Sequence, residues 1–139
     1  MRVLIVEDEF YSRKVLETFM QRYGKCDVVE DGDEAVDSFR GSLVERAPYD
    51  LVLLDIMMPK LDGQKTLERI RELEQQHDKG GMGTKVIMVT ALDDPQNIVK
   101  AFYQGGADSY LVKPIEKEKL EQELRNLGLL NHAPNKNHH

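Results

Sequence analysis

The chain has 139 residues, a hydrophobic fraction of 40% and a formal net charge of -6 at pH 7. This length suits one ordinary domain with a single core, and the acidic balance argues against direct binding of nucleic acid. The single cysteine cannot form an intramolecular disulfide, and no Cys/His cluster has zinc spacing. The first ten residues, MRVLIVEDEF, hold too short an apolar run for a signal peptide or a membrane span. We therefore expect one cytoplasmic domain that contacts neither nucleic acid nor membrane directly.

Short β-rich runs alternate with segments of helical periodicity. The predicted strands are Val3–Val6, Val28–Val29, Leu51–Leu54, Val86–Val89 and Tyr110–Val112. Apolar residues at helical spacing follow each strand in turn: Val15, Leu16, Phe19, Met20 and Tyr23; Ala35, Val36, Phe39 and Leu43; Leu67, Ile70 and Leu73; Ile98, Val99 and Phe102; Leu120, Leu124 and Leu127. Apolar strands joined by amphipathic helices indicate a parallel sheet covered on both faces. We expect an α/β fold: a doubly wound, five-stranded parallel sheet with five helices.

Two stretches stand outside this alternation. The segment HDKGGMGTK, from His77 to Lys85, lacks the GxxxxGKS/T spacing and the strand-to-helix position of a phosphate-binding loop, so we interpret it as a connecting loop. Residues 129–139 form a polar tail whose final His138 and His139 resemble the remnant of a purification tag. The expected domain therefore comprises residues 1–128.

Charged and polar side chains follow four of the predicted strands. They are Glu7, Asp8 and Glu9 after the first strand, Asp55 after the third, Thr90 after the fourth and Lys113 after the fifth. In an open parallel sheet the carboxyl ends of the strands meet at one edge, where ligands bind at the switch point of strand order. We expect three carboxylates, one hydroxyl and one ammonium to share a pocket there.

The three carboxylates of this pocket need a counter-charge. Two carboxylates about 5 Å apart repel by roughly 3 kcal/mol at an effective dielectric constant of about 20, and one lysine cannot offset three charges. An all-oxygen site open to water and phosphate suits Mg²⁺ better than zinc. Asp8 and Asp55 are the expected direct ligands, with Glu7 reaching the ion directly or through water.

Acids after strands also have a simpler explanation, because Asp and Glu cap helices and favour turns. We expect no more than this of Glu9 and Asp94. For Glu7 and Asp8 taken alone, both interpretations stay open. The arrival of polar residues from three other strands at the same edge favours the metal site.

Asp55 ends a buried apolar run, and an aspartate beside Mg²⁺ can attack a phosphoryl group to form an acyl phosphate. Lys113 can neutralise charge on the transferred oxygens, and Thr90 can donate a hydrogen bond to one of them. We expect Asp55, Thr90 and Lys113 to be the catalytic residues.

Four segments, VLIVEDE, LVLLDIMMPKLDG, VIMVTA and GGADSYLVKP, occur in this order at fitting intervals. Together they resemble the motifs of the response-regulator receiver domain, the CheY-like family of two-component signalling. The resemblance runs from Arg2 to Leu127. It implies a flavodoxin-like fold and a protein that catalyses only its own phosphorylation and dephosphorylation.

The resemblance assigns roles residue by residue at the acidic pocket. It implies that Asp55 accepts a phosphoryl group from a sensor histidine kinase or a phosphotransfer protein. Glu7, Asp8 and Asp55, together with the backbone carbonyl of Met57, would bind Mg²⁺. Lys113 would contact the phosphoryl group.

The resemblance also implies a switch. Thr90 would move toward the phosphoryl group while Tyr110 swings inward, whereas Tyr110 without this context would be a half-buried aromatic. The Lys113–Pro114 peptide bond would be cis, a form that proline makes accessible.

Met57 and Leu92 lie two places after Asp55 and Thr90, where the resemblance places residues that tune hydrolysis of the acyl phosphate. Both are apolar here, and an apolar side chain cannot orient an attacking water. We expect slow self-dephosphorylation, although both residues also fit a simple rim of the pocket.

Three rival functions are weaker. A phosphatase of the haloacid dehalogenase type needs a second acid two residues after the nucleophile, where this chain has Met57. A flavodoxin-like FMN site needs a phosphate-binding loop where this chain has acids. A phosphorylation-independent docking module does not need the full set of Asp8, Asp55, Thr90 and Lys113.

The sequence shows no DNA-binding or enzymatic output segment, so we expect either a stand-alone regulator or the receiver fragment of a longer one. The short tail and Gly128 favour the first. The expected reporting face for a downstream protein comprises the fourth helix, fifth strand and fifth helix, with Lys100, Tyr103, Tyr110 and Lys117. Regulators of the OmpR type carry a dimerising arginine where this chain has Glu123, so we expect a monomer or a weak dimer.

Overall fold

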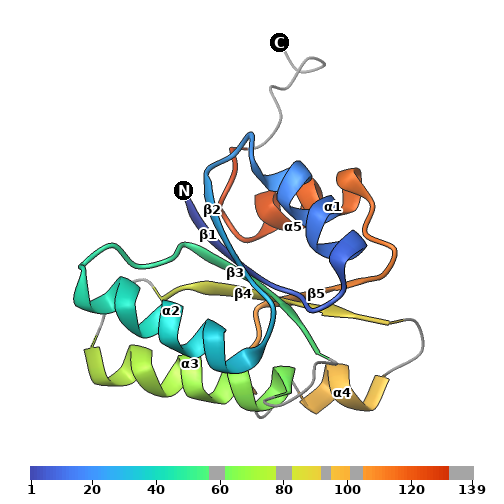
Figure 1. Cartoon of the computed structure of the whole chain (residues 1–139). Helices are drawn as coiled ribbons and strands as arrows, with labels where there is room; N and C mark the ends of the chain where they lie inside the picture. The colour runs from blue at the N-terminus through green and yellow to red at the C-terminus, as the bar shows by residue number, and fades with distance from the viewer. Residues whose placement is uncertain (57–61, 78–82, 92–94, 101–104, 132–139) are drawn as a thin grey trace.

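The structure is a computed structural model that describes residues 1–56, 62–77, 83–91, 95–100 and 105–131. In these residues, five strands alternate with five helices (Figure 1). The strands are β1 (Arg2–Val6), β2 (Lys25–Val29), β3 (Leu51–Asp55), β4 (Lys85–Thr90) and β5 (Ser109–Val112). The helices are α1 (Phe10–Met20), α2 (Gly32–Val44), α3 (Gly63–His77), α4 (Pro95–Lys100) and α5 (Lys117–Asn126). The alternation confirms the predicted α/β fold.

The strands form one parallel sheet in the order β2-β1-β3-β4-β5. The central strands β1, β3 and β4 are almost wholly buried, as their continuous apolar sequences predict. The chain leaves β1 for one side of the sheet and β3 for the other, so the switch point lies between these two strands. The ligand crevice of such a sheet therefore lies at the carboxyl ends of β1 and β3.

Two helical layers cover the sheet (Figure 1). On one face, α2 and α3 pack against the sheet in a cluster that includes Phe39, Leu67 and Ile70. On the other face, α1 and α5 pack in a second cluster with Leu16 and Leu120 at its centre. Both layers bury apolar stripes at the spacing that the sequence predicts.

Two segments differ from the sequence-based expectations. Val99, which helical spacing places on a buried face, is 54% exposed. Phe102 lies outside the described residues. At the other end of the chain, Leu129 and Leu130 pack against the second cluster although we assign them to the polar tail.

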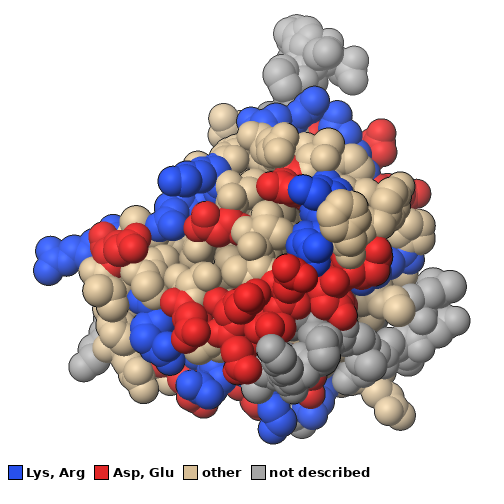
Figure 2. Space-filling view, in the orientation of Figure 1, with Lys and Arg blue, Asp and Glu red and all other residues tan. Residues whose placement is uncertain are grey.

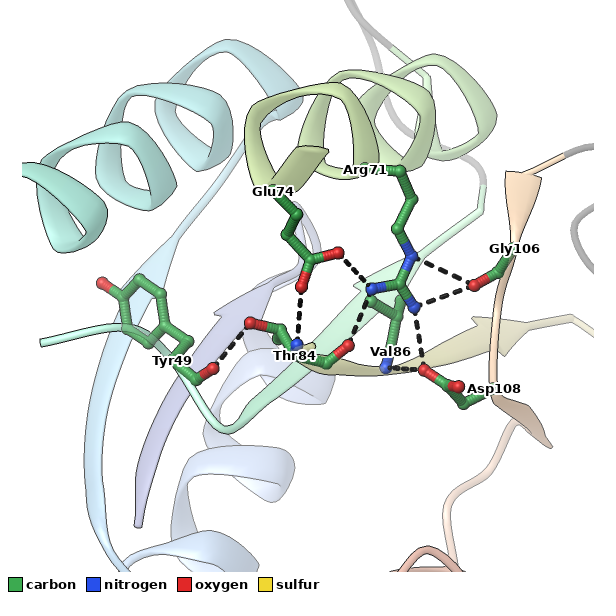
Figure 3. Close-up of polar contacts among 7 residues, drawn as sticks. All are labelled: Tyr49, Arg71, Glu74, Thr84, Val86, Gly106 and Asp108. Atoms are coloured by element: carbon green, nitrogen blue, oxygen red, sulfur yellow. Dashed lines mark hydrogen bonds and ion pairs between the residues drawn. The ribbon is translucent and has the colours of Figure 1, made fainter. Parts of the chain in front are cut away.

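A polar network joins α3 to the amino-terminal end of β4 and to the turn before β5 (Figure 3). The Arg71 guanidinium donates to Gly106 O, to Thr84 O at 2.7 Å and to the carboxylates of Glu74 at 2.6 Å and Asp108 at 2.8 Å. Asp108 Oδ2 also accepts from the Val86 backbone N–H at 2.8 Å. The network thus fixes how β5 begins against β4.

Across the described ranges, no helix is both long and apolar enough to cross a bilayer.

Candidate magnesium and phosphoryl site

Two neighbouring strands deliver the acids of the site. Val6, the last residue of β1, pairs with Leu54 of β3, so the residues that follow them, Glu7 and Asp55, emerge side by side. One carboxylate oxygen from each of Glu7, Asp8 and Asp55 lies within 4.8 Å of the other two. The topology therefore brings together the three side chains that the sequence analysis assigns to Mg²⁺.

The acids differ in exposure. Glu7 is fully buried and Asp55 is 4% exposed, whereas Asp8 is exposed. Glu7 Oε2 accepts a hydrogen bond from the Glu9 backbone N–H at 3.1 Å, but Oε1 accepts none and is buried. A buried charge is costly without a partner. The site therefore needs cations close to Glu7.

Lys113 supplies one of these cations. Its Nζ lies 2.9 Å from Glu7 Oε1 and 3.5 Å from Asp55 Oδ2. The backbone positions it, because β5 ends beside β4 and the Lys113 N–H donates to Thr90 O at 2.8 Å. Partial burial lowers the pKa of Lys113, but the contacts with Glu7 and Asp55 outweigh it, so the pKa lies above its ordinary value. Lys113 is therefore an ammonium at neutral pH.

The donor set fits Mg²⁺. Three carboxylates and one ammonium leave a net charge of two negative units, and a small divalent cation with oxygen ligands balances them. Glu7 Oε1 is buried with the Lys113 ammonium 2.9 Å away, so a bound ion would add a second positive charge beside this carboxylate. The fourth protein ligand that the resemblance implies, the backbone carbonyl of Met57, lies outside the described residues.

The expected switch residues occupy the two strands beside the site. Thr90 is the last residue of β4 and is buried, and its Oγ1 donates to Ala91 O at 3.1 Å. Tyr110 pairs with Met88 across β4 and β5 and is 42% exposed. Tyr110 is thus partly open to solvent, and Lys100 of α4, another residue of the face that we expect to contact a downstream protein, is exposed.

Several other expectations concern residues near the site. The Lys113–Pro114 peptide bond is cis, which confirms the prediction. Glu9 caps α1 by accepting hydrogen bonds from the backbone of Tyr11 and from the backbone and hydroxyl of Ser12. The Ser12 hydroxyl, followed by the backbone donors, lowers the pKa of Glu9. Glu9 therefore acts as the cap that the simpler explanation predicts. Leu92, Asp94, Pro59 and Tyr103 lie outside the described residues.

Gly63 allows α3 to begin close to the end of β3. Its N–H donates to Ile56 O at 3.0 Å, and a Cβ on Gly63 would lie 2.3 Å from Asp55 O. No side chain fits at that distance. The absence of a side chain at position 63 therefore sets the position of the backbone that carries Asp55.

An acidic surface patch and a cavity lie next to the site. Figure 2 shows Asp and Glu side chains gathered on one face, over the ends of β1 and β2 and the start of α2 (compare Figure 1). The exposed acids of these segments are Asp8, Glu9, Glu30, Asp33 and Glu34. A mainly apolar cavity of about 750 Å³ also adjoins the site, between α1 and residues 113–115.

Arg13, which lies one turn into α1, is a site residue that the sequence motifs did not predict. Its Nη1 donates to the backbone carbonyls of Glu7 at 3.1 Å and Asp8 at 3.2 Å. Helical side chains lean toward the amino terminus of their helix. A basic residue five places after Asp8 was therefore the sequence pattern that could have predicted this contact.

Known proteins resemble this chain in sequence. A family model described as the response regulator receiver domain matches residues 3–125. The two-component response regulator ORR41 of Oryza sativa subsp. japonica is 40% identical over 122 residues, which cover 86% of this chain and 87% of that protein. The transcriptional regulatory protein ResD of Bacillus subtilis (strain 168) is 36% identical over 86% of this chain, but the chain spans only 44% of ResD.

Solved structures agree. The receiver domain of the histidine kinase CKI1 from Arabidopsis thaliana, complexed with Mg²⁺, superposes with a TM-score of 0.80 and 28% identity over 91% of this chain and 90% of that one. The receiver domain of the sensor histidine kinase PA1611 from Pseudomonas aeruginosa PAO1, with a magnesium ion in its active site cleft, gives 0.72 and 29% over 90% and 94%. The match of residues 3–125, the shared sheet and the acids at its edge lead to one conclusion: the chain belongs to the response regulator receiver domain family of two-component signalling.

Proposed function

We propose that the chain is phosphorylated on Asp55 in a Mg²⁺-dependent reaction and that this modification changes the surface formed by α4, β5 and α5. The observation that carries the proposal is the gathering of three carboxylates within 4.8 Å, with the Lys113 ammonium on two of them. The family match supports it, since these side chains occupy the positions that the resemblance assigns to phosphoryl transfer.

The chain's own residues account for the chemistry. A carboxylate oxygen of Asp55 attacks phosphorus, an O–P bond forms, and the bond from phosphorus to the donor nitrogen of a phosphohistidine breaks. The donor imidazole keeps the electron pair of that bond. Lys113 holds a positive charge against Asp55 before the reaction and against the phosphoryl oxygens after it. Bound Mg²⁺ would supply further charge neutralisation, with Glu7, Asp8 and Asp55 as its protein ligands.

The proposed response is a shift between two arrangements of Thr90 and Tyr110. Thr90 would donate its hydroxyl proton to a phosphoryl oxygen instead of to Ala91 O. Tyr110, now 42% exposed, would turn inward and change the reporting face. We propose a sensor histidine kinase or a phosphotransfer protein as the donor and a downstream protein as the partner of that face.

Glu123 occupies the position at which regulators of the OmpR type carry a dimerising arginine, so its contacts are relevant to the oligomeric state. The Ser109 hydroxyl donates to its carboxylate, so this residue joins α5 to β5 within one chain. The proposed state is a monomer or a weak dimer.

Intact-mass analysis after treatment with acetyl phosphate tests the proposal. The parent protein should gain one phosphoryl group with Mg²⁺ and none with EDTA, and Asp55→Asn should gain none under either condition. An adduct of equal yield on Asp55→Asn would contradict the assignment of Asp55. No adduct on the parent, despite metal binding, would favour a docking module that needs no phosphorylation.

A further inference from the structure

Arg13 makes contacts that the phosphorylation chemistry does not use. Its Nη1 carries two hydrogens, and the carbonyls of Glu7 and Asp8 lie 3.1 and 3.2 Å away. The same nitrogen lies 3.5 Å from Glu30 Oε1 at the end of β2. The side chain is only 15% exposed, so a single guanidinium joins α1, the β1–α1 loop and β2.

Electrostatic repulsion favours opening of the β1–α1 loop, residues 7–9. This loop carries two of three mutually repelling carboxylates, and its residues Asp8 and Glu9 are exposed. The side chain of Glu9 caps α1, and its N–H binds Glu7 Oε2. Among the described side chains, Arg13 donates hydrogen bonds to the backbone carbonyls of both Glu7 and Asp8.

We propose that Arg13 is a positioning residue that holds the Glu7–Asp8 backbone in the conformation that accepts Mg²⁺. The inference rests on the proposed metal site and adds a residue that touches neither ion nor phosphoryl group. Arg13 has two opposing effects on the affinity for Mg²⁺. Its hydrogen bonds order the ligands and raise the affinity, whereas its positive charge repels the ion and lowers it. The direction in which the affinity changes on mutation therefore shows which effect is larger.

Mg²⁺ titration calorimetry tests the proposal on the parent, Arg13→Met and Arg13→Lys. Removing a group that orients metal ligands weakens affinity by roughly tenfold, which we expect for Arg13→Met. Arg13→Lys should bind no more tightly than Arg13→Met, because it keeps the repelling charge while its ammonium sits one bond nearer the main chain than Nη1 and falls short of the two carbonyls. Arg40→Met is the matched control, since Arg40 on α2 pairs with exposed Asp37 and should leave the affinity unchanged.

A second readout does not involve the metal. Hydrogen exchange of the Glu9 amide, which donates to Glu7 Oε2, should be faster in metal-free Arg13→Met than in the parent, while exchange of the Val28 amide in β2 stays the same. Faster exchange at both amides would instead indicate a general loss of stability and overturn the positioning role.

The remaining outcomes are distinct. Tighter binding by Arg13→Met, with Arg13→Lys equal to the parent, would overturn the proposal in favour of a purely electrostatic effect. Unchanged affinity in both variants would also overturn it. A parent protein that binds no Mg²⁺ would refute the proposed metal site itself, and the exchange of the Glu9 amide would still report whether Arg13 holds the loop.

Discussion

At the scale of single residues, the acidic side chains at the edge of the sheet lie close together despite their mutual repulsion. Glu7 and Asp55 are buried beside each other, and Asp8 adds a third negative charge at the surface. Lys113 is the one described side chain that the structure shows paired with both buried acids. Stability and metal binding are therefore in conflict at this site.

Asp8→Asn exposes that conflict. We expect it to raise the free energy of unfolding in EDTA by about 1 kcal/mol, because it removes one repelling charge from a solvent-screened position. It should also reduce the stabilisation that Mg²⁺ gives the parent, since the ion loses a ligand. Urea unfolding with and without Mg²⁺ measures both effects.

Asp33→Asn is the control for this change. Asp33 is also an exposed acid, but it lies in the first turn of α2, where a negative charge favours the helix. Its removal should lower the free energy of unfolding by a few tenths of a kcal/mol and leave the Mg²⁺ effect intact. A loss of stability in Asp8→Asn would contradict the repulsion argument.

The strand ends could be predicted from the sequence because they follow from topology alone. Once the strands are parallel, the residues after them share one edge, and this places Asp55 and Lys113 together. Arg13 could not be found in this way. It acts from inside a helix through backbone carbonyls, and a pattern of acids and strand ends carries no information about such contacts.

At the scale of secondary-structure elements, Gly63 sets how closely α3 approaches β3. Gly63→Ala should lower the free energy of unfolding by about 2 kcal/mol, because its Cβ would lie 2.3 Å from Asp55 O and must push α3 from β3. The same shift should slow phosphorylation by acetyl phosphate. Thermal unfolding and intact-mass time courses measure the two effects.

Gly41→Ala is its counterpart inside α2. Nothing lies within 4 Å of the Cβ position, so alanine should raise the free energy of unfolding by about 0.5–1 kcal/mol through helix propensity. Phosphorylation should keep its parent rate. Equal effects of the two substitutions would refute the packing argument for Gly63.

The network in Figure 3 makes Arg71 and Asp108 the residues that fix the start of β5. Arg71→Met should cost about 1–3 kcal/mol, since it leaves the partly buried acceptors of Glu74, Thr84 and Asp108 without their donor. A double-mutant cycle with Asp108→Asn should give a coupling energy of at least about 1 kcal/mol. Arg69→Met, which removes an exposed pair with Glu72 on the same helix, should cost less than about 0.5 kcal/mol. Additive losses at Arg71 and Asp108 would contradict the shared role.

Sequence patterns predicted elements best where burial is continuous. β1, β3 and β4 match their apolar runs within one residue at each end. The edge strand β2 extends to Lys25, three residues before the predicted Val28, because its first half alternates polar and apolar residues. The Arg71 network escaped prediction altogether, as its partners come from three separate segments.

At the scale of the whole molecule, the sheet separates two apolar clusters. The residues that follow α5 contribute to the second cluster. Leu129 and Leu130 pack against the second cluster, and both N–H groups donate to Leu124 O in α5. A chain that ends at Gly128 should therefore lose about 1–2 kcal/mol of unfolding free energy relative to one that ends at Asn131. Urea unfolding of the two truncated chains measures it, and equal stability would place the boundary at Gly128.

The parallel sheet and its five strand–helix pairs were predictable because hydrophobic period and strand order constrain few topologies. The packing of Leu129 and Leu130 against the second cluster was not predictable, because two leucines in a polar tail give no periodic signal.

The central claim is that Asp55 carries the phosphoryl group. Borohydride reduction of the protein treated with acetyl phosphate and Mg²⁺ converts a phosphorylated aspartate to homoserine, which peptide mass spectrometry then locates. The account predicts homoserine at position 55 alone, and none when EDTA replaces Mg²⁺. Homoserine at position 8, or at position 55 without any metal, would contradict it.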